Sequence, residues 1–375
     1  MSRKRRSDPP KYRQIRQKLL ALAIEEKWER GHRFPTELEL VRRYKVSRNT
    51  VRQSLADLER DGLIQRRQGQ GTFFEGNGGQ GNGRHFLVGA IVSSTAYIYT
   101  EIIQGAERVL SAAGYHLVMG RSTLHSPSDR TEAAARRSWN PDGFLLELWH
   151  PDHAVDMARV MGELKGSGTP FVLLNWSSED PEVSFVTPDD VEAGAHAGSY
   201  LVANGHRRIA FVGIKGHTPS ELRLKGFLRS AAQSAVAVPP DLLRWCEGAD
   251  SQWRSGAHAA TAEMLSLGAA RPTAVFYFND EAASQGYAAI REAGLSVPGD
   301  ISVVGFDDSQ ISRALYPSLT TFLHPKDRIG EMAARILLDR IEDPDSSLPV
   351  RVTYTCKLIE RDSVRNLAKE KHLNG

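Results

Sequence analysis

Four polar side chains share one face of a short predicted helix near the start of the chain: Arg48, Asn49, Arg52 and Gln53. Val51, Leu55 and Leu58 recur at helical spacing, so they would face a core and leave those four side chains pointing outward. Arginine can donate forked hydrogen bonds to guanine, and Asn or Gln can pair in the same way with adenine. Thr50 is placed to contact a phosphate or a thymine methyl group. The pattern is typical of a helix that reads the major groove of DNA; a solvated helix face is the alternative.

A second set of polar side chains follows short apolar runs farther along the chain: Ser93, Glu147, Asn175, Asn279, Asp280, Asp307 and Asp308. If the runs are parallel strands, these residues stand at their carboxyl ends, where open α/β folds bind ligands. Carboxylates and amides there could hydrogen-bond the hydroxyl groups of a polyol. The residue types therefore favour a carbohydrate effector. The alternatives are local: helix caps at Asp280 and Asp308, and turns at Ser93 and Asn175.

The same carboxylates raise the possibility of an enzyme, because Glu147 and Asp307 would suit a carbohydrate hydrolase. The chain has no GxSxG motif, P-loop or zinc-binding spacing, and its two cysteines, Cys246 and Cys356, stand far apart. We therefore predict a protein that is not an enzyme and uses no cofactor or metal. The absence of a disulfide framework favours a cytoplasmic protein. The chain has no stretch of about 20 apolar residues, so we expect no membrane span, and we expect no signal peptide.

The first set of residues requires a small N-terminal domain, which we place at residues 1–75. Its apolar residues recur at helical spacing in three successive segments, which predicts three short helices. Thr36 and Glu39 form a capping box at the start of the second helix, and Ser47 is a natural N-cap for the third. These signals indicate a helix-turn-helix that presents the polar face described above.

Two short strands are predicted after the third helix, at residues 63–67 and 72–74, joined by a glycine-containing turn. The order of elements is that of an α+β winged helix-turn-helix. Residues 1–75 carry 19 Lys and Arg against 10 Asp and Glu; the whole chain carries 48 against 45, so the rest carries 29 against 35. A compact basic unit binds polyanions because phosphate neutralisation releases counterions. Charge and fold thus agree on double-stranded DNA as a partner.

The second set of residues requires a larger C-terminal domain, which we place at residues 86–365. Seven apolar runs there alternate with helix-length segments, which predicts an α/β fold with parallel sheets. The length exceeds that of one ordinary core, so two lobes are expected. Residues 76–85 are rich in glycine and predict a flexible linker between the two domains.

Several ordered blocks in the N-terminal domain resemble the GntR family of winged helices: Phe34-Pro-Thr-Glu-Leu-Glu-Leu, Val46-Ser-Arg-Asn-Thr-Val-Arg and Arg67-Gln-Gly-Gln-Gly-Thr-Phe. The resemblance implies that Arg48 and Arg52 contact DNA in the major groove or at phosphates. It also implies that Gln68 and Gly69 lie at the tip of the wing near the minor groove. Leu38 departs from the family pattern, because many members have an arginine there, and this leaves the operator preference open.

A second resemblance is to the LacI and periplasmic-sugar-binding-protein-like domain, and four blocks carry it: Gly205-His-Arg-Arg-Ile-Ala-Phe, Arg223-Leu-Lys-Gly-Phe, Phe278-Asn-Asp-Glu-Ala-Ala and Val297-Pro-Gly-Asp-Ile-Ser-Val-Val-Gly-Phe-Asp-Asp. It covers residues 86–360 and implies a two-lobed periplasmic-binding-protein-like fold. The effector contacts that it implies are seven: Ser93, Glu147, Asn175, Arg223, Trp253, Asn279 and Asp307.

The combination of a GntR-type head with a LacI-type effector domain resembles the arabinose-repressor group. It implies a homodimeric transcription repressor that binds a palindromic operator and responds to a small sugar. The sequence leaves four alternatives open: an activator, a repressor that needs a non-sugar corepressor, a transport binding protein, and a carbohydrate-processing enzyme. It does not identify the effector, the operator or the sign of the response.

Overall fold

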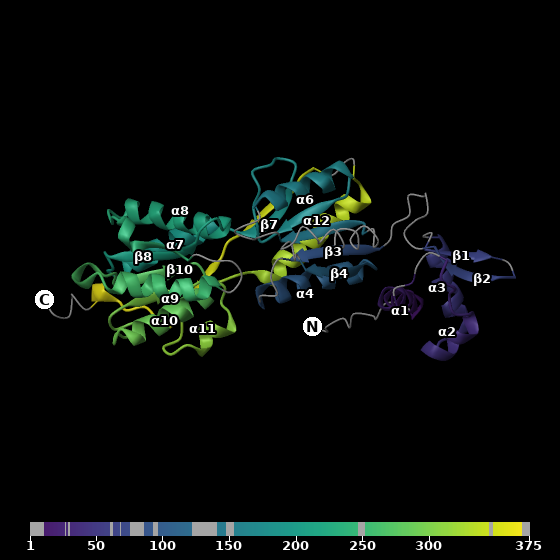
Figure 1. Cartoon of the computed structure of the whole chain (residues 1–375), viewed down its shortest axis with the longest axis horizontal. Helices are drawn as coiled ribbons and strands as arrows, with labels where there is room; N and C mark the ends of the chain where they lie inside the picture. Colours follow the sequence, from purple (N-terminus) through teal and green to yellow (C-terminus); the bar gives the residue numbers. More distant parts are fainter. Residues whose placement is uncertain are drawn as a thin grey trace, which may run out of the picture.

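The computed structural model describes residues 11–26, 28, 31–60, 63–67, 69–75, 86–92, 97–121, 141–147, 154–246, 252–344 and 348–369. They form a small head and two α/β lobes that follow one another along the long axis of the molecule (Figure 1). The predicted linker, Gln68 and Ser93 lie outside the described residues, as does the side chain of Trp253. Among the helices of these ranges, none combines the length and hydropathy that crossing a membrane requires.

The head contains three helices and a two-stranded antiparallel wing: α1 Lys11–Glu25, α2 Glu37–Tyr44, α3 Arg48–Arg60, β1 Ile64–Arg67 and β2 Gly71–Phe74. The predicted capping box is present, because the Thr36 N–H donates to Glu39 Oε2 at 2.7 Å and the Glu39 N–H donates to Thr36 Oγ1 at 3.4 Å. Ser47 Oγ accepts from the Thr50 N–H at 3.1 Å, as predicted for an N-cap. The predicted apolar positions of α3 are buried in the core of the head: Val51, Leu55 and Leu58.

The first lobe is built on a parallel sheet with the strand order β13-β7-β6-β5-β3-β4. Its elements are β3 Leu87–Val92, α4 Tyr97–Ala112, β4 His116–Arg121, β5 Gly143–Glu147, α6 Ala154–Gly166, β6 Phe171–Leu174, β7 Ser184–Pro188, α12 Lys326–Glu342 and β13 Arg351–Tyr354. Helices α4 and α12 approach closely at glycines: a Cβ on Gly330 would lie 1.8 Å from the Ile102 carbonyl oxygen. This contact fixes the late helix α12 onto the early helix α4.

The second lobe has a four-stranded parallel sheet with the order β11-β10-β8-β9. Its elements are α7 Asp190–Ala203, β8 Ile209–Ile214, α8 Thr218–Gln233, η1 Pro240–Leu242, β9 Leu243–Cys246, α9 Gln252–Leu265, η2 Gly268–Ala270, β10 Ala274–Tyr277, α10 Asp280–Glu292, β11 Ser302–Val304 and α11 Gln310–Ala314. Helices α7 and α8 again pack through glycines, since a Cβ on Gly226 would lie 1.9 Å from the Val191 carbonyl oxygen. Each lobe is therefore a tightly packed unit.

The described chain crosses between the lobes three times, at β7 to α7, at β12 to α12 and at β13 to β14 (Figure 1). The crossing strands β12 Thr321–Leu323 and β14 Lys357–Ile359 pair antiparallel. Because β7 leads directly into α7 of the second lobe, the carboxyl edge of the first sheet faces that lobe. The predicted parallel α/β fold is confirmed, and each of the seven apolar runs contains one of its strands.

Candidate DNA and effector sites

The polar face of α3 is exposed, as the helical spacing predicted. The side chains of Arg48 and Arg52 are 60% and 54% exposed, and the Nε atoms of both lie near one carboxylate, Glu37 of α2, at 2.9 and 3.0 Å. Partial burial tends to raise the pKa of Glu37, but hydrogen bonds and charge from the two arginines hold it below its usual value. Because these ion pairs use Nε, the terminal nitrogens of each guanidinium can turn toward DNA. Glu37 was not among the residues singled out from the sequence.

The other predicted DNA contacts differ in how they are held. Asn49 and Gln53 are exposed on α3. The Thr50 hydroxyl lies 2.8 Å from Ser47 Oγ, within the N-cap of α3. Gly69 has a φ of 75° in the turn between the wing strands, a conformation that favours glycine. Leu38 on α2 is 55% exposed, which is unusual for a large apolar side chain and fits a surface that meets a partner.

In the first lobe, the predicted residues meet around a tyrosine that sequence analysis missed. Glu147 ends β5 and Asn175 follows β6 with a φ of 57°; both are buried. The Tyr99 hydroxyl, on α4, is hydrogen-bonded to both of these side chains, and burial followed by the Glu147 charge raises the pKa of Tyr99 well above its usual value. The Oδ1 atom of Asn175 is buried with no hydrogen-bond partner in the described structure.

In the second lobe, Arg223 is buried and is held from three sides. Its Nε donates to Asp190 Oδ1 at 2.8 Å, its Nη1 donates to the Phe278 carbonyl oxygen, and its guanidinium lies 3.5 Å from the centre of the Phe306 ring. Burial raises the pKa of Asp190 to about 6, although Arg223 acts in the opposite direction. The structure shows that Arg223 anchors Asp190, and its role as an effector contact stays a prediction.

Asp307 lies beside a buried histidine that was also missed. Its Oδ1 is 3.1 Å from His324 Nδ1, and its φ of 121° places the carboxylate on an uncommon backbone. Burial lowers the pKa of His324, so the ring is neutral near pH 7. Because Nδ1 then donates to the carboxylate, Nε2 is an acceptor, and it is buried without a partner in the described structure.

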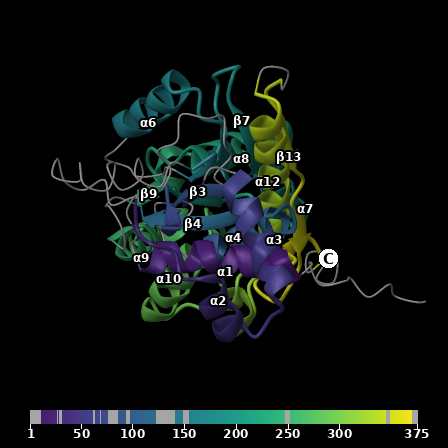
Figure 2. The ribbon, with the colours of Figure 1, turned by 90° about the vertical axis from the view of Figure 1, so that its right-hand side faces the viewer.

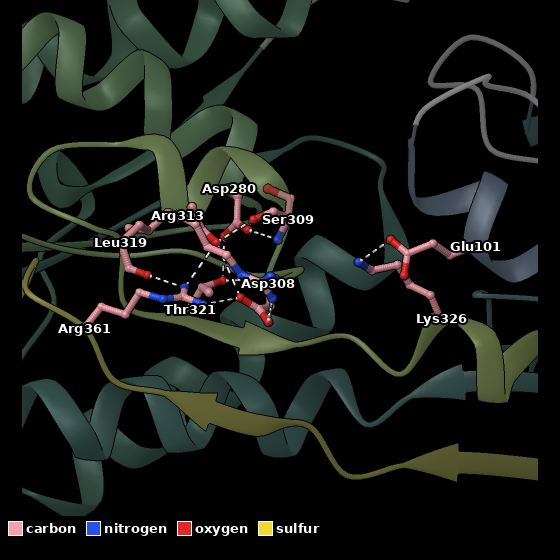
Figure 3. A network of polar contacts seen from close by, with 10 residues as sticks. Glu101, Asp280, Asp308, Ser309, Arg313, Leu319, Thr321, Lys326 and Arg361 are labelled. Atoms are coloured by element: carbon pink, nitrogen blue, oxygen red, sulfur yellow. Dashed lines mark hydrogen bonds and ion pairs between the residues drawn. The ribbon is translucent and has the colours of Figure 1, made fainter.

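The adjoining carboxylates have structural partners (Figure 3). Asn279 caps α10, since its Oδ1 accepts from the Ala282 N–H at 2.8 Å; its role as an effector contact stays a prediction. Asp280 is not the cap, but accepts from the Ser309 N–H at 2.8 Å and from Thr321 Oγ1 at 2.5 Å. Burial, together with the Asp307 charge, raises the pKa of Asp280 to about 8.

Asp308 is likewise no helix cap, because its carboxylate forms ion pairs with Arg361 at 2.5 Å and Arg313 at 2.9 Å. These pairs tie the segment after β11 to α11 and to the C-terminal segment (Figure 3). The helix-cap alternative for Asp280 and Asp308 was therefore wrong, because each carboxylate found longer-range partners that no sequence pattern indicated.

Side chains from both lobes converge between the carboxyl ends of the two sheets. The charge of Asp307 in the second lobe contributes to the raised pKa of Tyr99 in the first lobe. The ring of Trp176, which follows β6, lies 5.7 Å from the ring of His217 in the second lobe. His217 caps α8 by accepting from the Ser220 N–H, and burial, with Arg223 nearby, lowers its pKa to about 3. The described residues contain no group of three or more His, Cys, Asp and Glu side chains that could hold a metal ion.

The two domains match two known families. Residues 11–74 match the bacterial regulatory proteins of the gntR family, and residues 199–364 match the periplasmic binding protein-like domain. The chain is 30% identical to the arabinose metabolism transcriptional repressor of Geobacillus stearothermophilus over 96% of this chain and 98% of that protein. It is 32% identical to the HTH-type transcriptional repressor PurR of Salmonella newport over 72% and 77% of the two chains.

Among solved structures, a LacI family transcriptional regulator from Enterococcus faecium with bound ribose superposes with a TM-score of 0.62 and 27% identity, covering 75% of this chain and 99% of that one. The match over nearly the whole length with the arabinose repressor includes both the head and the two lobes. The chain therefore belongs to the arabinose-repressor group, as a bacterial transcription regulator that joins a GntR-type winged helix to a LacI-like effector domain.

Proposed function

We propose that the protein is a cytoplasmic homodimeric repressor whose effector is a neutral, unphosphorylated sugar. One observation carries the effector class: the buried acceptors Asn175 Oδ1 and His324 Nε2, one from each lobe, have no hydrogen-bond partner within the described part of the chain. Acceptors without partners favour a ligand that donates hydrogen bonds, as hydroxyl groups do. The hydroxyl groups of such a ligand would also donate to the nearby carboxylates of Glu147 and Asp307.

The charges around these acceptors favour a neutral ligand over an anionic one. Glu147, Asp190 and Asp307 are buried carboxylates, whereas Arg223 already pairs with Asp190. Lys326, the other buried cation near His324, pairs with Glu101 at 3.1 Å (Figure 3). A phosphate or carboxylate ligand would therefore meet like charges while the nearby cations are already paired.

The relatives support a pentose in particular. One is named for arabinose metabolism, and one solved neighbour holds ribose. L-arabinose and D-ribose are therefore the first candidates. A non-sugar corepressor such as a purine, which the sequence left open, is the second candidate, although acceptors without hydrogen-bond partners favour a sugar.

The head supports binding to a palindromic operator, because two copies of a winged helix related by twofold symmetry read inverted half-sites. We place the DNA-binding domain at residues 1–75 and the effector domain at residues 86–365. The proposed DNA contacts are Arg48, Asn49, Thr50, Arg52, Gln53, Gln68 and Gly69. The proposed effector contacts are Ser93, Glu147, Asn175, Arg223, Trp253, Asn279 and Asp307, to which we add Tyr99 and His324 because they lie against these side chains.

A thermal-shift experiment on the full chain tests the effector class, because a ligand that binds the native state raises its melting temperature. L-arabinose, D-ribose, D-ribose 5-phosphate and hypoxanthine would be compared for the parent, for Asn175→Gly, which keeps the backbone conformation, and for Glu179→Ala, an exposed control on the same loop. We expect a rise with a free pentose that Asn175→Gly abolishes and Glu179→Ala retains. A rise only with the phosphate or with hypoxanthine would refute the neutral-sugar proposal.

The same sugar should be recovered unchanged after prolonged incubation, since we propose binding without turnover. Release of a product would favour the hydrolase that the paired carboxylates first suggested. Sedimentation equilibrium of the full chain tests the homodimer independently.

A further inference from the structure

The head and the first lobe touch through a cation and an aromatic ring. Arg16 of α1 is only 7% exposed, and its guanidinium carbon lies 4.1 Å from the centre of the Phe86 ring. Phe86 immediately precedes β3, so it belongs to the lobe and not to the head. A guanidinium at this distance from an aromatic face is attracted by the ring electrons. The contact therefore joins the two domains directly.

Phe86 is held in place by its own lobe. Its carbonyl oxygen accepts from the His116 N–H at 2.8 Å, and its ring lies 5.2 Å from the ring of Tyr115, which is buried. Its φ of 56° fixes an uncommon backbone at the start of β3. We call Phe86, Tyr115 and His116 the docking patch. Because the lobe sets the position of the patch, Arg16 meets a preformed surface.

The docking patch carries no positive charge that would repel Arg16. Burial, and then the charge of Arg16, lower the pKa of His116, so the imidazole is neutral near pH 7 and does not repel the guanidinium. The neighbouring α1 side chains Ile15 and Leu19 face the core of the head, whereas Arg16 does not belong to that core. Arg16 therefore lies outside the core of the head and contacts Phe86 of the lobe.

The docking patch lies at the amino ends of β3 and β4, opposite the edge that carries the effector side chains. Strand β3 joins the two edges, because Phe86 precedes it and Val92 at its far end pairs with Glu147. Figures 1 and 2 show α1 against this end of the first lobe. A single rigid sheet thus connects the head to one wall of the effector site.

We propose that Arg16 docks the DNA-binding head onto the first lobe, so that the head and this lobe move as one body. The head would then keep a fixed orientation toward the first lobe in the absence of DNA and effector. The docking depends only on contacts within the chain, so its test does not depend on which effector binds.

Distances between spin labels on the full chain, without DNA or ligand, test the docking. One label is placed on the head by Ala56→Cys and one on the first lobe by Ser111→Cys, both at exposed positions, whereas Cys246 and Cys356 are buried. An excess of unlabelled chain ensures that only distances within one chain are read. The parent should give a single narrow distance.

Three changes sharpen the test. Arg16→Ala should lose the narrow distance, and Arg16→Met, which keeps the apolar stem, should lose it too, because the charge is gone. Phe86→Leu should do the same by removing the aromatic face. Lys18→Ala removes an exposed charge from the same helix and should leave the distance narrow. A narrow distance that persists in Arg16→Ala and Phe86→Leu, or a broad distance in the parent, would overturn the proposal.

Discussion

The two candidate sites hold their polar side chains in opposite ways. In the head, Arg48 and Arg52 are more than half exposed and share one carboxylate, whereas in the lobes Arg223 and its partner Asp190 are almost wholly buried. Exposed ion pairs contribute little to stability because water screens them, whereas breaking a buried pair leaves an uncompensated charge. A site for a large charged partner can therefore be built separately from the fold, but a site for a small ligand is part of the core.

The largest effect should come from breaking the buried pair. Arg223→Ala removes the guanidinium that holds the pKa of Asp190 down, so the buried carboxyl must either stay charged without a partner or take up a proton. We expect this change to lower the free energy of unfolding by about 3 to 5 kcal/mol. Urea unfolding followed by circular dichroism measures this. Arg229→Ala, a change at a less buried arginine on the same helix, should alter stability by less than about 0.5 kcal/mol. Equal effects of the two changes would contradict the contrast between the sites.

In the head, the corresponding change should affect binding and leave stability nearly unchanged. Arg52→Ala should weaken operator binding by about 1 to 3 kcal/mol if the guanidinium reads a base. Fluorescence anisotropy with labelled operator and with a scrambled duplex separates base reading from phosphate contact. A uniform loss on both duplexes would assign Arg52 to the backbone, and an unchanged affinity would remove it from the interface.

The pH dependence of stability should come from the buried site. His217 has a folded pKa of about 3, well below the ordinary value near 6.5, so the unfolded state binds the proton more readily. Its contribution to stability is present above pH 6.5 and is lost as the pH falls toward 3, by about 2 kcal/mol between pH 7 and 5. His217→Asn retains an N-cap but no titrating ring. The free energy of urea unfolding should therefore fall more steeply with decreasing pH for the parent than for His217→Asn. Parallel curves for the two proteins would refute the assignment.

The smallest effect should come from a local feature of the head. Thr36→Ala removes the side chain that caps α2, so the free energy of unfolding should fall by about 1 kcal/mol. Thr36→Ser keeps the hydroxyl and should retain most of that stability. Thermal melts of the parent and of both variants measure the difference. If both variants behave alike, the capping box contributes nothing measurable.

The contrast between the sites also accounts for what the sequence could predict. The exposed face of α3 follows from helical spacing alone, and Thr36, Glu39 and Ser47 act on neighbours within three residues, so all were predictable. Residues at strand ends, such as Glu147 and Asn175, could be placed at the correct edge because parallel strands share a direction. Their partners could not, because Tyr99, His217 and His324 come from helix starts and crossings that only tertiary packing brings together.

The strands that the sequence did not predict were missed for a related physical reason. β7 contains Ser, Thr and Pro among its five residues, and β9, β12, β13 and β14 are three or four residues long. Such segments lack the continuous apolar run that marks a buried strand. They are held by pairing with strands distant in sequence, as β13 is held by β7.

The order of the elements along the chain has a consequence for synthesis on the ribosome. The core of the first lobe includes Ile329 and Leu337 of α12, and its sheet is completed by β13, although its other strands end at residue 188. The ribosome must therefore make the second lobe as far as α11 before the first lobe can close. During that interval the emerging first sheet lacks α12, one of the helices that cover it, and its last strand β13. It is then the part of the nascent chain most exposed to aggregation and to chaperones, while the head can already fold.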